Sequence, residues 1–399
     1  MNDGRQLYIP KGFQFAAVKA GLKASGSLDF AIAEAPLGAS AAALFTTNLV
    51  CAAPVIVGKD HLRRARGRIR AVVVNAGNAN CATGKPGYDA AVNVCRRAAR
   101  TLEVAPEFII PSSTGIIGVP LPVEKLTTAL PLLVGAKRQG EEAVHEFARA
   151  IMTTDTRPKL ASVQIAVGSK KAGILGAAKG SGMIHPNLAT MLVYIFTDVE
   201  ASPAELKSAL REACRTTFNR ITVDGDTSTN DTVLLMASGQ SGVLARKAKS
   251  QFSGAVLQIC RSLADQIVAD GEGVKHVVNI TVEGARTEPD ADTIARTIAH
   301  SMLNKTAWAG ADPNWGRILA AVGRSGVKVD PSKVDVHIGG QQVCKIGGAV
   351  EFDEKAAHEL MLQPRYEIRV KIGAGKGRAS VLTCDLTAEY VHINADYST

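Results

Sequence analysis

The sequence is poor in aromatic residues and contains neither long hydrophobic runs nor an apolar leader segment. Phe, Trp and Tyr make up 5% of the 399 residues, whereas proteins that bind single-stranded nucleic acids stack bases on aromatic side chains beside basic ones. No stretch approaches the ~18 consecutive apolar residues of a membrane-spanning helix. The first residues, 1–6, carry none of the apolar segment that a secretory signal requires. We therefore expect neither nucleic acid nor a membrane as a partner.

Cysteine and histidine patterns typical of bridges and metal centres are also missing. The seven cysteines are an odd number, and no two have CxxC spacing. A disulfide framework or a zinc ribbon is therefore not expected, and the usage fits a reducing compartment, which predicts a cytoplasmic protein. The eight histidines show no metal-ligand spacing, so we expect no metal.

The chain does have an excess of positive charge. Lys and Arg number 46 against 37 Asp and Glu, which gives a net charge of +9. The densest basic run covers residues 59–70 and contains no aromatic residue. We interpret it as a solvated helix face or a subunit contact, and keep binding of nucleic acid or another anion as the alternative.

Short apolar runs alternate with helical patterns, which indicates a mixed α/β protein. Ser202-Pro203-Ala204-Glu205 is a capping box with proline at the first helical position, and predicts a helix from there to about residue 217. From about residue 275 the pattern indicates a smaller α+β unit, so we expect domains at 1–274 and 275–399. Strands are expected at 71–74, 108–110, 163–167, 172–178, 190–197, 274–282, 334–338, 366–372 and 379–386, and further helices at 89–102, 141–152, 252–270, 292–303 and 353–362.

The sequence contains no GxSxG elbow, no HExxH motif and no GxxxxGK[ST] loop, which leaves Thr190 as a candidate nucleophile. A threonine hydroxyl becomes reactive when the residue is the first of a chain, because its own α-amine, with a pKa near ~7.7–8.0, then serves as the general base. Thr190 can reach that state if its Oγ attacks the Ala189 carbonyl and water releases the resulting ester. A small, glycine-containing loop before an apolar strand suits this reaction, although an ordinary strand start has the same appearance.

Four blocks of sequence decide between these readings. Residues 179–192 (KGSGMIHPNLATML) resemble the self-cleavage signature of the ornithine acetyltransferase family, the glutamate N-acetyltransferases of arginine biosynthesis. Residues 153–159, 218–231 and 312–318 resemble further blocks of that family, in the same order along nearly the whole chain. His185 and Leu188 are mild variants within the signature, and neither supplies the nucleophile.

The resemblance implies a fold and a reaction. The fold is a four-layer αββα sandwich of the self-processing, N-terminal-nucleophile type, with a smaller C-terminal α/β unit. Cleavage between Ala189 and Thr190 gives an α chain, 1–189, and a β chain, 190–399. Thr190 takes the acetyl group from N-acetylornithine and passes it to glutamate, which is ping-pong covalent catalysis.

The resemblance also implies the site residues. Thr114 and Gly115 match the family's oxyanion pair, and such a donor contributes ~2.7–4 kcal/mol to a transition state. Lys179 offers a positive charge to a carboxylate, and Glu272 accepts an ammonium group. The substrate contacts implied are Thr154, Lys179, Thr190, Glu272, Asn394 and Thr399.

Two polar blocks have structural readings. In residues 224–231 the spacing of Asp224, Asp226 and Ser228 is that of the first ligands of a calcium loop, but Thr229 and Leu235 occupy the positions of its glycine and closing glutamate. We expect a hydrogen-bonded loop lining the site. The block 312–317 is expected to be a packed turn near the active site or a subunit contact, and the glycine-rich 373–378 a turn between strands.

The family further implies an α2β2 heterotetramer and no cofactor, with acetyl-CoA possible as a second acetyl donor. No residue decides between one donor and two. A self-processing aminopeptidase or amidase of related architecture, which passes the acyl group to water, is the enzymatic alternative. A non-catalytic protein that binds nucleic acid or another anion is the alternative from a different class.

Overall fold

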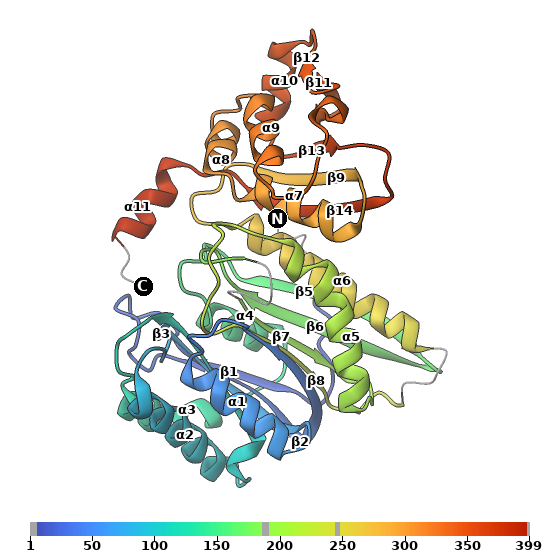
Figure 1. Ribbon diagram of the computed structural model, residues 1–399. Helices are drawn as coiled ribbons and strands as arrows, with labels where there is room; N and C mark the ends of the chain where they lie inside the picture. Colours follow the sequence, from blue (N-terminus) through green and yellow to red (C-terminus); the bar gives the residue numbers. More distant parts are fainter. Residues whose placement is uncertain (1–5, 186–190, 244–247, 397–399) are drawn as a thin grey trace. The chain divides into compact units, whose positions relative to one another are not determined.

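Two β-sheets, each covered by helices, form the computed structural model, which describes residues 6–185, 191–243 and 248–396 (Figure 1). The chain divides into two units, Met1–Asn219 with Asp226–Ile267, and Arg220–Gly225 with Val268–Ser398. The domains expected from the sequence, 1–274 and 275–399, stay a prediction.

The first unit is built on an eight-stranded sheet of order β4-β3-β2-β8-β7-β6-β5, with β1 paired to β2. The pairs β3–β4 and β7–β8 are parallel, and the other pairs are antiparallel. Its strands are β1 (Gln14–Val18), β2 (Phe30–Phe45), β3 (Arg68–Asn78), β4 (Ile109–Ile116), β5 (Lys159–Val167), β6 (Lys170–Lys179), β7 (Leu192–Thr197) and β8 (Thr232–Ala237).

Strand β2 joins the two halves of this sheet. Its first part pairs with β1 and β3 and its last part with β8, and the register shifts between Glu34 and Ala39. Side chains from both halves, such as Val72 of β3 and Tyr194 of β7, share one buried core. The two inner layers of the expected sandwich are thus halves of one continuous sheet that bury side chains in a common core.

Helices cover the outer faces of both halves. Side chains of α2 and α3 pack with Ile32 and Val73 on one outer face. On the other, the side chains of Ile259 and Leu263 in α6 lie so close to Gly176 of β6 that a Cβ there would be 2.6 Å from one of them. The helices of this unit are α1 (Ala53–Arg64), α2 (Gly84–Thr101), α3 (Val123–Gly135), α4 (Glu141–Ala150), α5 (Pro203–Thr216) and α6 (Lys249–Val268). The mixed α/β fold with helical outer layers is therefore confirmed.

The second unit has a six-stranded mixed sheet of order β12-β11-β10-β13-β9-β14. Its strands are β9 (Val277–Ala285), β10 (Asp335–Ile338), β11 (Gln341–Lys345), β12 (Gly348–Ala349), β13 (Arg365–Lys371) and β14 (Gly377–Cys384). Its helices are α7 (Glu288–Ala299), α8 (Met302–Ala309), α9 (Trp315–Gly323), α10 (Glu354–Met361) and α11 (Ala388–Asp396). Residues 373–378 connect β13 to β14, and β9 lies between these two strands.

One expected helix is two helices. The pattern over 292–303 predicted a single helix, but α7 ends at Ala299 and α8 begins at Met302. Ser301 separates them, because its side chain accepts a hydrogen bond from the Asn304 amide and so caps a new helix. Apolar spacing continues across this break, which is why the pattern did not reveal it.

Two properties concern the whole described chain. No helix in the described ranges is both long and apolar enough to cross a bilayer. The seven cysteines are free thiols.

Candidate active site

Gly115 lies near the end of β4, where the neighbouring strand β3 leaves no room for a side chain. Its φ is +126°, and a Cβ at this position would be 2.4 Å from the carbonyl carbon of Gly77. The parallel register pairs Gly77 with Gly115 and becomes irregular at the next residue, Asn78. Glycine is thus required by close approach of two backbones, beside the buried residue Thr114.

Buried amides fix the backbone that leads to Gly115. The Ser113 hydroxyl donates to Asn75 Oδ1 at 2.6 Å, and Asn75 Nδ2 donates to the carbonyl of Asn78 at 2.9 Å. Asn230 Nδ2 donates to the carbonyls of Ala79 and Ser113 at 2.6 and 2.9 Å. Because buried amides with satisfied hydrogen bonds are costly to move, residues 113–115 are held rigidly. The sequence reading had not singled out Asn75 and Asn230, although Asn75 begins the Asn-rich segment 75–80 and Asn230 lies in the polar block 224–231.

Lys179, the last residue of β6, contacts the oxyanion candidate directly. Its Nζ donates to Thr114 Oγ1 at 3.1 Å, and both side chains are buried. In the antiparallel ladder Lys179 is paired with Leu192, the first residue of β7. The structure therefore brings the predicted residues Thr114 and Lys179 together, next to the start of β7.

The buried carboxylate of Asp155 supplies negative charge to this region. It accepts from Lys159 Nζ at 2.6 Å and from the Gly180 amide at 2.7 Å. Burial alone would raise the pKa of Asp155, but Lys159, Lys179 and the Gly180 hydrogen bond outweigh it and hold the pKa at about 2. Asp155 is thus ionised at neutral pH, where it favours a charged Lys179.

The predicted contact Thr154 belongs to the same cluster. Its hydroxyl and that of the buried Ser181 are 2.7 Å apart. The neighbouring amide of Thr153 donates to Asp155 Oδ2 at 3.0 Å. Side-chain hydrogen bonds of Thr154 and Asp155 therefore connect residues 153–155 to residues 179–181.

Ala189 and Thr190, the predicted cleavage site and nucleophile, lie outside the described residues. The residue that follows them is firmly held: the Met191 amide donates to Asp231 Oδ1 at 2.7 Å, and the Met191 carbonyl accepts from the Thr232 amide at 3.1 Å. Asp231 is buried and adjoins Asn230. The dipeptide 230–231 thus binds the backbone at Ser113 through one residue and at Met191 through the other.

The predicted residues Glu272 and Asn394 are brought together in the second unit. Asn394 Nδ2, on α11, donates to Glu272 Oε2 at 2.8 Å. Gly273, with φ +67°, lies so close to α11 that a Cβ would be 2.6 Å from the Tyr390 amide nitrogen. Thr399, the last predicted contact, lies outside the described residues.

Two further interactions join the Glu272 loop to the segment before α11. The Thr387 hydroxyl donates to the carbonyl of Gly273 at 2.7 Å. The buried Asp385 accepts from the Lys275 amide at 3.0 Å and lies 3.0 Å from His276 Nδ1. We call residues 271–276 and 384–387 the clamp, since each fixes the other.

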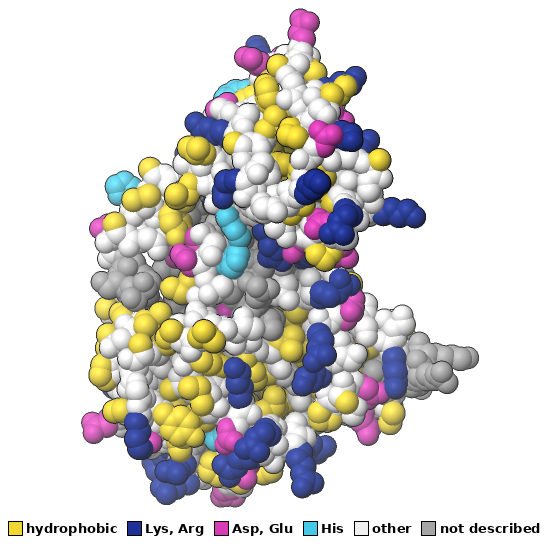
Figure 2. Space-filling view, viewed as in Figure 1, with side chains coloured by type: hydrophobic (Ala, Val, Ile, Leu, Met, Phe, Trp, Pro, Cys, Tyr) yellow, Lys and Arg dark blue, Asp and Glu magenta, His cyan; other side chains and the backbone are white. Residues whose placement is uncertain are grey.

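Several side chains of the basic run 59–70 form ion pairs with nearby acidic residues. It spans the end of α1 and the start of β3. Arg63 and Arg64 pair with Asp60, and Arg70 pairs with the buried Glu34 at 2.6 Å. Figure 2 shows Lys and Arg side chains mostly interspersed with acidic and apolar ones on the face in view. This arrangement fits the solvated-face reading of the run.

The chemistry of the described site is that of hydroxyl, amide, ammonium and carboxylate groups. No group of three or more His, Cys, Asp or Glu side chains within the described ranges is placed to hold a metal ion. Within an α/β fold, such hydroxyl, amide and ammonium groups can hold a carboxylate and stabilise an oxyanion, which are the tasks of an enzyme of acyl-group transfer.

Comparison with known proteins gives the family. The ArgJ family model matches residues 14–399. The arginine biosynthesis bifunctional protein ArgJ of Dehalococcoides mccartyi is 44% identical and covers 100% of this chain and 98% of its own. That of Thermus thermophilus is 45% identical over 98% of this chain and 99% of its own. A crystal structure of ornithine acetyltransferase complexed with ornithine from Mycobacterium tuberculosis is 34% identical, with a TM-score of 0.40, and covers 46% of this chain and 96% of that one.

The chain therefore belongs to the ArgJ family. It is an acetyltransferase of arginine biosynthesis that acts on small molecules, and the family, fold class and enzyme class expected from the sequence are confirmed.

Proposed function

We propose that the chain is a self-processing enzyme that transfers the acetyl group of N-acetylornithine to glutamate through an ester on Thr190. The observation that carries this is the double attachment of residues 230–231. Asn230 holds the carbonyl of Ser113, and Asp231 holds the amide of Met191. Thr190 and the pair Thr114–Gly115 therefore each adjoin a residue held by the same dipeptide.

The first reaction is cleavage of the chain. Thr190 Oγ attacks the carbonyl carbon of Ala189, the C–N bond to Thr190 breaks, and an ester and a free amine result. Water then hydrolyses the ester, which leaves a carboxylate on Ala189 and the free hydroxyl and amine of Thr190. The products are the α chain, 1–189, and the β chain, 190–399.

The second reaction uses the new amine as its base. Thr190 Oγ attacks the acetyl carbonyl of N-acetylornithine, the amide bond breaks, and ornithine leaves with the proton that the α-amine has taken up. Glutamate then attacks the acetyl ester through its amine, the ester bond to Thr190 Oγ breaks, and a proton from the attacking amine regenerates the hydroxyl. Both tetrahedral intermediates carry an oxyanion, which Thr114 and Gly115 stabilise.

Charge complementarity assigns the substrate contacts. Lys179, whose positive charge lowers the pKa of Asp155, binds a carboxylate with help from the Thr154 hydroxyl. Glu272 binds the ammonium end of ornithine. Asn394, which already donates to Glu272, and Thr399 complete the set. We propose no cofactor, acetyl-CoA as a possible second donor, an α2β2 assembly and a cytoplasmic location.

Thr190→Ala tests the proposal. Denaturing electrophoresis of the wild-type protein is expected to show two bands, and the C-terminal fragment to begin Thr-Met-Leu-Val. Thr190→Ala removes the only atom that attacks in both reactions, so one intact band and no transfer are expected. Transfer activity retained in this variant would disprove the mechanism.

Product analysis identifies the acetyl acceptor, and initial rates identify the acetyl donor. With N-acetylornithine and glutamate, we expect N-acetylglutamate and ornithine in equal amounts. Release of acetate instead would favour the amidase alternative, in which water accepts the acetyl group. Initial rates with acetyl-CoA in place of N-acetylornithine show whether the enzyme uses one donor or two.

A further inference from the structure

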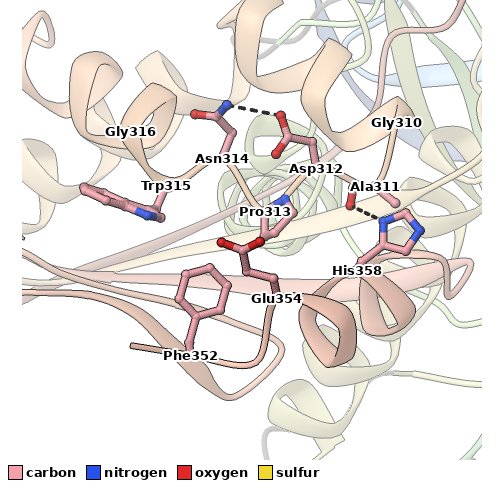
Figure 3. A pocket seen from close by; sticks show the side chains of 10 residues that line it. All are labelled: Gly310, Ala311, Asp312, Pro313, Asn314, Trp315, Gly316, Phe352, Glu354 and His358. Carbon is pink, nitrogen blue, oxygen red and sulfur yellow. Dashed lines mark hydrogen bonds between the residues drawn. The ribbon is translucent and has the colours of Figure 1, made fainter. Parts of the chain in front are cut away.

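The second unit contains a hollow that the acetyl transfer does not use. It has a volume of about 600 Å³ and is formed by the loop between α8 and α9 and by the start of α10 (Figure 3). This loop carries the block 312–317, which the sequence predicted to be a packed turn. A volume of 300–1,000 Å³ is typical of sites for small molecules. We call it the 312–358 hollow.

Two carboxylates at this hollow have no cationic partner in the part of the chain that the structure describes. Asp312 is exposed, and among the described residues its carboxylate accepts one hydrogen bond, from Asn314 Nδ2 at 3.1 Å. Glu354 is exposed and makes neither a hydrogen bond nor an ion pair within the same residues. In a chain with a net charge of +9, two neighbouring acidic side chains left without Lys or Arg favour a cation from outside the chain.

Two aromatic rings line the same hollow. Trp315 and Phe352 are half-buried, and both rings are part of the lining (Figure 3). Aromatic faces attract cations, and tryptophan does so most strongly. A ligand that combines positive charge with a flat, stackable surface would use both features.

The lining also limits the kind of cation. His358 Nδ1 lies 2.9 Å from the carbonyl of Ala311 and so donates to it, which leaves Nε2 as the ring atom able to accept a proton or bind a ligand. The structure places no three metal-ligating side chains together among the residues it describes. An organic cation is therefore favoured over a metal ion.

Guanidinium fits this lining better than ammonium. A guanidinium group is planar, stacks on aromatic faces and is weakly hydrated, so it binds a carboxylate without full removal of water. An ammonium group is strongly hydrated and gains little in an open hollow. We propose that the 312–358 hollow is a binding site for a small guanidinium compound, held by Asp312 and Glu354 and stacked on Trp315.

Titration calorimetry of the full-length processed enzyme with L-arginine tests this proposal. L-citrulline is the matched control ligand, because it has the same shape and no charge. L-arginine is expected to bind, and citrulline to bind at least about tenfold more weakly. Glu354→Gln and Asp312→Asn each keep the size of an exposed side chain, and are expected to weaken arginine about three- to tenfold, as an exposed charge pair does. Trp315→Ala is expected to weaken it further.

Glu351→Gln is the control variant, since Glu351 is exposed, adjoins the hollow in sequence and does not line it. It is expected to bind arginine as the wild type does. Binding of citrulline equal to that of arginine, or arginine binding unaffected by Glu354→Gln, would overturn the proposal. L-ornithine that bound as tightly as L-arginine, with binding that Glu354→Gln also removed, would overturn it as well. So would a Glu354→Gln variant that changed the oligomeric state and left the affinity for arginine unchanged. None of these outcomes depends on Thr190, so the test stands apart from the acetyl transfer.

Discussion

At Gly115 the packing of two strands depends on the absence of a side chain, and so does the oxyanion role that we propose for this residue. The backbone there has a positive φ and lies against Gly77. A side chain would push β3 and β4 apart at the point where Thr114 meets Lys179. The residue is thus constrained by sterics before any chemistry is considered.

The variant Gly115→Ala is therefore expected to lower kcat by about 100-fold or more, the effect of losing one oxyanion donor, with some loss of stability. Gly118→Ala is the matched control: its φ is also positive, at +82°, but nothing lies within 4 Å of the added Cβ. Steady-state rates and thermal unfolding of both variants check this. Equal kcat in the two would contradict the role given to Gly115.

Asp155 makes the stability of the first unit depend on pH. Its folded pKa of about 2 is below the ~3.9 of an unfolded chain. A group with a lowered pKa stabilises the fold above its unfolded value and loses this effect as the pH falls through its folded value. We expect the free energy of unfolding to fall by roughly 2 kcal/mol between pH 4 and pH 2 from this group.

Urea unfolding at several pH values checks the prediction, with Asp155→Asn as the comparison. The variant is expected to be less stable at pH 7, because Lys159 is left buried beside a neutral amide, and to lose less stability on acidification. A variant with the same pH dependence as the wild type would show that another group is responsible.

At the scale of elements, the start of β7 depends on one carboxylate. Asp231 accepts the hydrogen bond of the Met191 amide, directly after the predicted cleavage site. Asp231→Ala removes this acceptor, and is expected to slow chain cleavage by about tenfold or more, given ~1.5–3 kcal/mol for a hydrogen bond to a charged group. Asp231→Asn keeps an oxygen at this position and is expected to slow cleavage less.

The time course of uncut and cut bands after expression measures these rates. Glu212→Gln, which changes an exposed carboxylate on α5, serves as the control and is expected to cleave at the wild-type rate. If Asp231→Ala cleaved as fast as this control, the anchoring of Met191 would be irrelevant to processing.

The clamp between residues 271–276 and 384–387 positions Glu272 against α11. His276→Gln and Asp385→Asn each break one of its interactions. We expect a rise in KM for N-acetylornithine of about three- to tenfold with a smaller change in kcat, because Glu272 is displaced and Thr190 is not. His145, which pairs with Glu141 on the exposed side of α4 at 3.7 Å, offers the matched control His145→Gln, with KM unchanged.

Local chemistry made some elements predictable and hid others. The capping box at Ser202 and Glu205 gave the start of α5, because both of its hydrogen bonds form within four residues. Strand β2 was missed because Pro36 and Gly38 interrupt it, and such residues normally end a strand. Here they fall where the register shifts and the two halves of the sheet meet.

The site was predictable where one short motif carries it, and not where distant residues meet. Thr114, Gly115 and Lys179 followed from family motifs. Asn75 and Asn230 did not, since their importance lies in hydrogen bonds to carbonyls far away in the sequence. Satisfaction of buried backbone groups is a property of the folded chain and has no local sequence pattern.

At the scale of the whole molecule, the two predicted fragments share one sheet. Strands β7 and β8 come after residue 190, and they lie between β2 and β6, which come before it. Six residue pairs join β6 to β7, and six join β2 to β8. Separation of the fragments would therefore expose the shared core as well as break these ladders.

We expect the cleaved fragments to co-elute in gel filtration at neutral pH, and to separate only in concentrated denaturant. Dilution to nanomolar concentration should not release either fragment. The comparison is uncut Thr190→Ala, which should elute at the same volume. Release of the C-terminal fragment on dilution would show that the sheet does not bridge the cut.

The central position of β7 and β8 also sets an order in time. Because β7 and β8 lie in the middle of the sheet, we expect the sheet to be complete before the proposed cleavage. Such a cleavage would change the connectivity of the chain and leave its architecture in place. If two genes encoded the halves separately, the shared sheet would have to form from two diffusing chains. A single gene supplies both halves in equal number within one chain.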